Sequence, residues 1–209
     1  MVAYFEAFIL YIILFLSGLS GLTGGSSVIP TEIIRIFLYF IPSLALIWYL
    51  LYRSNKIDLK IVKPGKKDLL SGLIAFPCLI AIGSVFSIIS SLTGNDPGQL
   101  VTSVSSVSSW IIICIFCLLS AYLEESFFRY YLFIKKDKLG LSTPLVIVLS
   151  VFLFSIGHIY DGFWGVLNSA VAGFILFLIF LKFKSIHGIA IAHCFYNIIA
   201  IILSVGNNP

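Results

Sequence analysis

The sequence predicts an all-α protein, a polytopic bundle of transmembrane helices. Of its 209 residues, 60% are hydrophobic and only 11% are charged. The mean hydropathy is +1.11, which is typical of chains that cross a membrane several times. The apolar runs are continuous rather than alternating. This favours helices over a β-barrel, because backbone polar groups in lipid must be satisfied within the segment.

Seven apolar stretches are long enough to cross about 30 Å of hydrocarbon, which takes about 20 helical residues. The first is weakened by Gly and Ser near its end and the fifth is short, so six or eight helices are the alternatives to seven. Because no repeat or linker divides the chain, we expect residues 1–209 to form one integral membrane domain. The stretches are 4–22, 33–52, 69–92, 109–134, 143–160, 163–183 and 186–205.

The loops between these stretches alternate in charge. The basic ones are residues 53–67, residues 135–142 and the turn with Lys182 and Lys184, whereas residues 93–108 and the turn with Asp161 contain no Lys or Arg. Basic loops face the cytoplasm, so the N-terminus is predicted to be cytoplasmic. The net charge of +4 therefore reflects membrane topology, and no nucleic-acid partner is expected. The Lys-, Ile- and Phe-rich composition suggests a prokaryotic plasma membrane.

Two adjacent carboxylates, Glu124 and Glu125, lie inside the fourth stretch, and Arg129 follows one turn on. A charge at bilayer depth costs about 2.5–3.5 kcal/mol on insertion scales, so such residues mark a functional site by default. Glu125 and Arg129 are four apart and can pair as structural support of the site. Glu124 is rotated by about 100° from Glu125 and is free to point elsewhere.

The other strongly polar residues lie in the fifth and seventh stretches. His158 follows Phe154 by one helical turn, so the Phe154 ring can line the site that contains His158. Asn197 follows His193 by one turn. We therefore expect residues 109–205 to be the catalytic core and residues 1–92 to be scaffold helices.

We expect Glu124, His158 and His193 to converge in one polar cavity, with Asn197 beside His193. A carboxylate and an imidazole can activate water, and a second imidazole and a carboxamide can stabilise an oxyanion. The same Glu124, His158 and His193 also match the ligands of a catalytic Zn²⁺ with an open position. The cofactor is thus either absent or one divalent metal.

The depth of one residue fits this hypothesis less well. At ~1.5 Å per residue, Glu124 lies about 16 Å from Lys135 and His193 about 14 Å from Lys184. His158 lies about 21 Å beyond Pro144, nearer the outer side, unless its helix is tilted or begins deeper.

Three motifs together resemble the CPBP family of intramembrane proteases, which contains CAAX proteases and bacteriocin-processing enzymes. Glu124-Glu125-Ser-Phe-Phe-Arg129 resembles its EExxxR motif, Phe154-Ser-Ile-Gly-His158 its FxxxH motif, and His193-Cys-Phe-Tyr-Asn197 its HxxxN motif. The order and spacing are similar over residues 109–200. The chain departs from the family at Tyr130, where members commonly have Gly.

The resemblance implies an α-helical endopeptidase that cleaves a membrane-associated peptide or protein. The residue matching Glu124 is the key carboxylate of that family, and the residue matching His158 acts with it on the water. Those matching His193 and Asn197 complete the site. Both a metal and a metal-free glutamate mechanism are argued for the family. Its members include CAAX prenyl proteases and proteins of bacteriocin processing or self-immunity.

Other classes of function remain as alternatives. One is a non-enzymatic immunity or scaffold protein of the same family. Another is an ion-coupled carrier with a Glu and His relay, although no inverted repeat is evident. A rhomboid-type serine protease would use Gly18-Leu-Ser20-Gly21 with His193, but small residues at the end of a helix are ordinary packing or turn residues.

Overall fold

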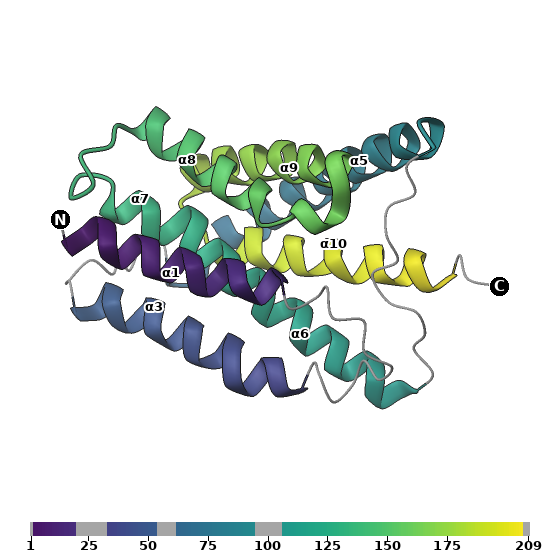
Figure 1. Cartoon of the computed structure of the whole chain (residues 1–209), viewed down its shortest axis with the longest axis horizontal. Helices are drawn as coiled ribbons and strands as arrows, with labels where there is room; N and C mark the ends of the chain where they lie inside the picture. Colours follow the sequence, from purple (N-terminus) through teal and green to yellow (C-terminus); the bar gives the residue numbers. More distant parts are fainter. Residues whose placement is uncertain (1, 20–32, 54–61, 95–105, 207–209) are drawn as a thin grey trace.

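The computed structural model describes residues 2–19, 33–53, 62–94 and 106–206, and this part of the chain is helical and contains no strand (Figure 1). The predicted all-α fold is confirmed, and each of the seven apolar stretches corresponds to one helical rod. Ser20 and the basic residues Lys56 and Lys60 lie outside the described residues. The rods are α1 (Val2–Leu19), η2 with α3 (Ile36–Phe40, Ile41–Arg53), α5 (Lys66–Leu92), α6 with η3 and α7 (Val107–Glu125, Ser126–Tyr131, Leu132–Lys135), α8 (Thr143–Ile156), η4 with α9 (Ile159–Asp161, Gly162–Phe183) and α10 (His187–Gly206).

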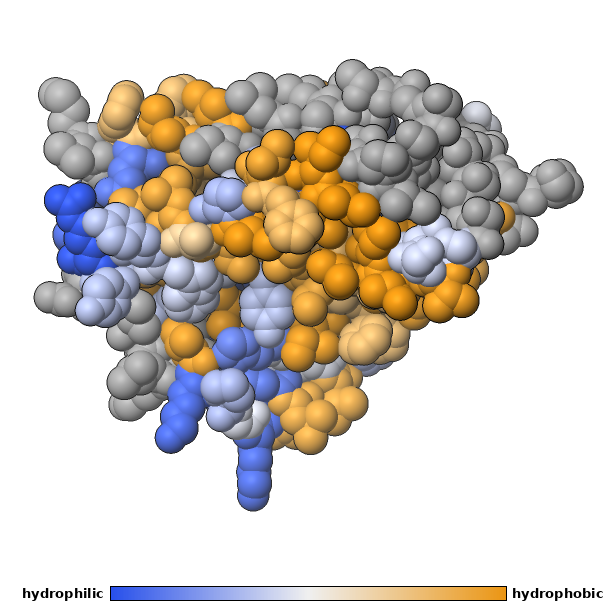
Figure 2. All heavy atoms as spheres, turned by 90° about the horizontal axis from the view of Figure 1, so that it is seen from below, coloured by the Kyte–Doolittle hydropathy of each residue, from blue (hydrophilic) through white to orange (hydrophobic). Residues whose placement is uncertain are grey.

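Five of these rods are long and apolar enough to cross a membrane: Ile33–Arg53, Lys66–Leu92, Val107–Lys135, Ile159–Phe183 and His187–Val205. They expose large apolar side chains, and Figure 2 shows a broad hydrophobic face on one side of the molecule. Such a face is far larger than the patches that water-soluble proteins expose. The protein is therefore an integral membrane protein.

The fifth stretch departs most from its prediction. Its helix, α8, ends at Ile156, four residues before the end of the predicted stretch. Its 14 residues are about 21 Å long, which is too short to cross 30 Å of hydrocarbon. Gly157 caps α8 through its backbone N–H, and the chain then turns through the short 3₁₀ helix η4 into α9. The turn at 157–161 therefore comes before the helix has reached the length of a full span.

Basic residues gather at one end of the bundle. Lys67 Nζ donates to the Lys184 carbonyl at 2.8 Å, and the Lys184 ammonium lies 3.9 Å from the centre of the Phe133 ring. Lys135 forms an ion pair with Glu6 at 2.9 Å, which ties α1 to α7. These contacts connect the basic ends of α5, α7 and α9, as the alternation of the loops predicts.

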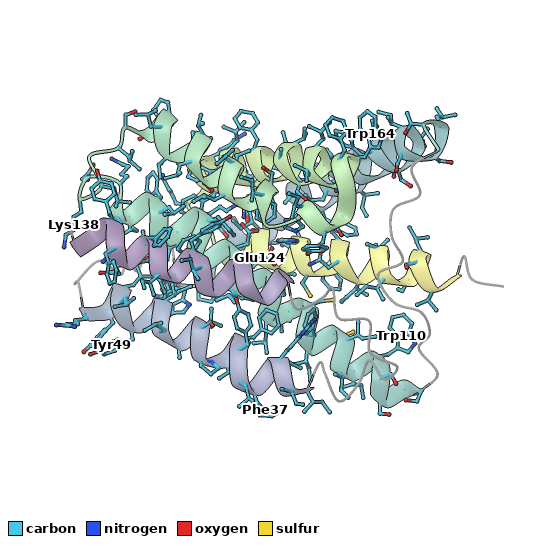
Figure 3. All side chains as sticks on the ribbon, viewed as in Figure 1. Phe37, Tyr49, Trp110, Glu124, Lys138 and Trp164 are labelled. Atoms are coloured by element: carbon cyan, nitrogen blue, oxygen red, sulfur yellow. The ribbon has the colours of Figure 1, made fainter. Side chains whose placement is uncertain are left out.

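The opposite end is joined by Trp164 of α9, whose indole N–H donates to Thr93 Oγ1 at 2.9 Å. Figure 3 shows Glu124 near the middle of the molecule, with Lys138 at one end and Trp164 at the other. Glu124 is therefore at mid-depth along the long axis of the bundle, as the count from Lys135 predicts.

The helices that carry the polar residues are held by close packing. α10 packs against α5 and α6, while α9 packs against α5 and α8. Glycines allow the close approaches: a Cβ on Gly72 would lie 3.2 Å from the Gly188 carbonyl oxygen. The division into scaffold helices at 1–92 and core helices at 109–205 stays a prediction, and α5 of the expected scaffold packs directly on the expected core.

Candidate active site

A buried ion pair lies where α6 passes into η3, a π-helical turn. Glu125 and Arg129 are both fully buried, and Glu125 Oε2 lies 3.1 Å from Arg129 Nε. Arg129 Nη2 also donates to the Gly173 carbonyl of α9 at 3.4 Å. The pairing follows from the spacing of four residues, as expected. Isolated π-turns of this kind are frequent at functional sites.

His193 of α10 lies between the two glutamates. Its Nδ1 is 2.9 Å from Glu125 Oε1, and its Nε2 is 3.7 Å from Glu124 Oε2. We expected Glu125 to serve Arg129 and Glu124 to point away from it. The rotation between the two residues does separate their carboxylates. One imidazole nevertheless reaches both, because its two nitrogens lie on different edges of the ring.

Glu124 is the more accessible carboxylate of the pair. Its side chain is 23% exposed, against 0% for Glu125. Ser120, one turn earlier on α6, donates its hydroxyl to Glu124 Oε1 at 2.9 Å. The other oxygen, Oε2, has no hydrogen-bond partner among the described residues. One oxygen of Glu124 is thus held by the protein, and the other is buried beside His193 without a hydrogen-bond partner among the described residues.

His158 lies in the turn after α8, next to Phe154. Its Nδ1 is 2.9 Å from the Phe154 carbonyl oxygen. Because a carbonyl only accepts, Nδ1 carries a hydrogen, and in the neutral ring Nε2 is left as the acceptor. The Phe154 ring centre lies 4.7 Å from that of His158 and 6.1 Å from that of His193. Phe154 therefore forms the wall shared by the two histidines.

Asp161, in the same turn as His158, is the third carboxylate near the candidate site after Glu124 and Glu125. Its backbone N–H donates to the His158 carbonyl at 3.0 Å, and residues three apart eclipse in a 3₁₀ turn. Its carboxylate interacts electrostatically with both His158 and Glu124. Asp161 occupies the N-cap position of α9 but makes no capping hydrogen bond. The short α8 brings the turn with His158 back toward the middle of the chain's span, and the depth of His158 relative to Glu124 stays a prediction.

Asn197 lies one turn after His193 on α10 and is half-buried. Its neighbour Tyr196 accepts a hydrogen bond from Asn168 Nδ2 of α9 at 3.2 Å, and a Cβ on Gly83 of α5 would clash with the Tyr196 hydroxyl. α10 is thus tied to both α9 and α5 next to Asn197. The side of α10 that carries His193 and Asn197 is fixed by these contacts.

Below the glutamates, toward the basic end, the η3 turn is closed by aromatic side chains. Its four aromatic residues are at most 5% exposed: Phe127, Phe128, Tyr130 and Tyr131. Phe127 and Tyr131 stack with their ring centres 5.6 Å apart. Tyr131 also donates to Glu6 of α1 at 2.6 Å. This turn forms a dry aromatic floor between the glutamates and the lysine-rich end.

The expected alternative metal ligands are Glu124, His158 and His193. In the part of the chain that the structure describes, no three His, Cys, Asp or Glu side chains are grouped so that they could hold a metal ion. The Nδ1 atoms of the two histidines are engaged by Glu125 and by the Phe154 carbonyl, which leaves Nε2 as the remaining nitrogen of each ring. The described residues as arranged therefore do not form a three-ligand metal centre.

Two residues of the site escaped the sequence reasoning. Ser120 lies four residues before Glu124, so the rule that paired Glu125 with Arg129 would have found it if applied toward the N-terminus. Asp161 was assigned to a loop because it follows an apolar stretch that was expected to end at residue 160. The early end of α8 instead places it in the turn that leads into α9.

Comparison with known families matches residues 106–199 to type II CAAX prenyl endopeptidase Rce1-like. The matched region begins just before α6 and ends within α10, so it includes every residue of the candidate site. The match confirms the resemblance to CAAX proteases that the three motifs indicate. No curated protein and no solved structure matches the chain.

Proposed function

We propose that this chain, whose residues 106–199 match the Rce1-like family of type II CAAX prenyl endopeptidases, is an intramembrane endopeptidase that hydrolyses a peptide bond in or next to the membrane. One observation carries the proposal: Glu124 Oε2 makes no hydrogen bond within the described residues and lies 3.7 Å from His193 Nε2. Two atoms at that distance can share one water at about 2.8 Å from each.

Glu124 acts as the general base on this water. As the water oxygen attacks the scissile carbonyl carbon, one of its protons passes to Glu124 Oε2. His158 assists from the other side, because the Nε2 of its neutral ring accepts the second hydrogen of the water. The Phe154 ring lies next to both histidines, with its centre 4.7 Å from that of His158 and 6.1 Å from that of His193.

His193 and Asn197 face the oxygen of the scissile carbonyl. The attack converts that oxygen into an oxyanion, which hydrogen-bond donors stabilise most where water is excluded. A doubly protonated His193 donates from Nδ1 to Glu125 and from Nε2 into the site, and the Asn197 amide supplies a second donor. The C–N bond then breaks, and the proton held by Glu124 passes to the leaving amine.

Glu125 and Arg129 hold this arrangement rather than react. Glu125 accepts from His193 and pairs with Arg129, so it fixes the ring orientation of the histidine. With His193 protonated, two carboxylates face two cations, and the four groups are neutral together. This balance makes a charged cluster tolerable at bilayer depth, where uncompensated charges are costly.

The substrate of this site is a membrane-associated peptide or protein.

The orientation in the membrane follows from the lysines. Positively charged ends face the cytoplasm, so the lysine-rich end of the bundle lies there. Tyr4 donates to the Leu139 carbonyl at 2.5 Å, which places the start of α1 at the same end. The N-terminus is then cytoplasmic, in a prokaryotic plasma membrane.

The test is cleavage by purified protein in liposomes, comparing the wild type with Glu124→Gln. The probes are a farnesylated peptide ending in a CAAX sequence and a bacteriocin-type leader peptide anchored in the bilayer, with products identified by mass spectrometry. The matched control is Glu6→Gln, which changes another carboxylate of the helices. Its partners Tyr131 and Lys135 follow Glu124 by seven and eleven residues, about 10 and 16 Å along the helix.

We expect Glu124→Gln to abolish cleavage and Glu6→Gln to retain it. Full cleavage by folded Glu124→Gln protein would refute the proposal. Protection of cells from a bacteriocin without any cleaved product would instead identify an immunity protein, and proton or ion flux into liposomes would identify a carrier. Both outcomes overturn the assignment.

A further inference from the structure

The hydrogen bond of the Ser120 side chain differs from those of Ser71 and Ser155 in the other described helices. Ser71 and Ser155 donate to carbonyl oxygens three residues earlier in their own helices, which is a common choice for serine in a helix. The Ser120 hydroxyl instead donates forward, to Glu124 Oε1, at 2.9 Å. The hydroxyl has one hydrogen, and it donates that hydrogen to the carboxylate that faces the site.

This hydrogen bond distinguishes the two oxygens of Glu124. Oε1 accepts from Ser120, whereas Oε2 has no hydrogen-bond partner and lies on the His193 side. A proton that arrives from water adds to the oxygen that is not already accepting a hydrogen bond, which is Oε2. The same oxygen then lies where it can return the proton to the leaving amine.

We propose that Ser120 is a positioning residue of the peptidase, and that its hydroxyl selects Glu124 Oε2 as the oxygen that takes and returns the catalytic proton. The inference rests on the proposed function. Ser120 does not need to touch the substrate, so its loss slows the chemical step and leaves substrate binding unchanged.

The experiment compares Ser120→Ala, Ser120→Thr and Glu124→Gln in the liposome cleavage assay, with kcat and KM measured separately. Ser150→Ala is the matched control, because its buried hydroxyl donates to the Phe128 carbonyl at 2.8 Å and does not touch Glu124. Infrared spectra of the same proteins record the carboxylate stretching bands, which respond to hydrogen bonding whether or not the protein is active.

We expect Ser120→Ala to lower kcat about tenfold at unchanged KM, the size of one hydrogen bond to a charged group. Ser120→Thr, which keeps the hydroxyl, should restore kcat, and Ser150→Ala should leave it unchanged. Ser120→Ala should also shift the infrared band that Glu124→Gln removes.

The inference and the proposed function fail in different ways. If Glu124→Gln is inactive while Ser120→Ala has the kcat of the wild type, the inference is overturned and the peptidase assignment stands. A defect that Ser120→Thr shares, or a carboxylate band unmoved by Ser120→Ala, overturns it too. If Glu124→Gln is fully active, the proposed function itself is overturned.

Discussion

Gly173 of α9 offers the most quantitative prediction, because an added methyl group there meets the wall of the site. A Cβ at this position would lie 2.9 Å from Phe154 Cδ1 and 3.3 Å from Arg129 Nη2. Carbon atoms in contact normally lie about 3.5–4.0 Å apart. Gly173→Ala must therefore push the Phe154 ring by at least about 0.6 Å, because contact requires that separation.

The ring has little room to yield. The Arg129 guanidinium lies 4.4 Å from its centre, and the ring centres of His158 and Phe128 lie 4.7 and 5.3 Å away. Overpacking of this kind costs about 1–3 kcal/mol in a packed core. That cost corresponds to a fall in melting temperature of about 2–12 °C for a chain of this size. Cleavage should fall with it, because Phe154 separates the two histidines.

Unfolding can be followed with a thiol-reactive dye, since Cys117 and Cys194 are buried. The control is Gly72→Ala, which also creates a close contact between helices, at 3.2 Å from the Gly188 carbonyl, but outside the site. It should lose stability and keep its activity per folded molecule. Adding Phe154→Leu to Gly173→Ala should recover stability. Unchanged stability of Gly173→Ala, or an equal loss of activity in both alanine variants, would contradict the reasoning.

Two further changes test the charges of the site. Arg129→Met removes the guanidinium that pairs with buried Glu125 and leaves the cluster one positive charge short. It should destabilise the protein by about 3–5 kcal/mol, measured as loss of folded protein on size-exclusion chromatography. The double variant Glu125→Gln, Arg129→Met should recover most of the lost stability, and no recovery would show that the charge is not the cause. Asp161→Asn removes a negative charge that acts on His158 and Glu124. It should therefore improve cleavage of peptides with a Glu beside the scissile bond about tenfold relative to peptides with a Lys there, the size expected for unit charges a few ångströms apart near a protein surface. An unchanged ratio of the two cleavage rates would show that Asp161 does not face the substrate.

The spans and the buried ion pair were predictable because each depends on the local sequence. A helix needs about 20 apolar residues to cross the bilayer, and such runs are visible without a structure. The pairing of Glu125 with Arg129 follows from the helical repeat alone. Both statements require only the geometry of one helix.

The contacts between helices could not be predicted from the sequence. Whether His193 reaches one glutamate or both depends on how α10 is placed against α6, and packing between helices that are far apart in the sequence sets that placement. The end of α8 at Ile156 was also missed, because residues 157–160 are apolar enough to continue a span in which only Gly157 signals a stop. Because of this error, Asp161 was assigned to a loop and not to the candidate site.

The aromatic floor formed by η3 has a consequence for the cell that houses this protein. The proposed hydrolysis would require water at the centre of the bilayer. A channel of water through the whole thickness of the bilayer would let ions leak and discharge the membrane potential. The packed rings of Phe127, Phe128, Tyr130 and Tyr131 insulate one half of that path. Water can thus reach the site from one side of the membrane only, and the membrane potential is kept.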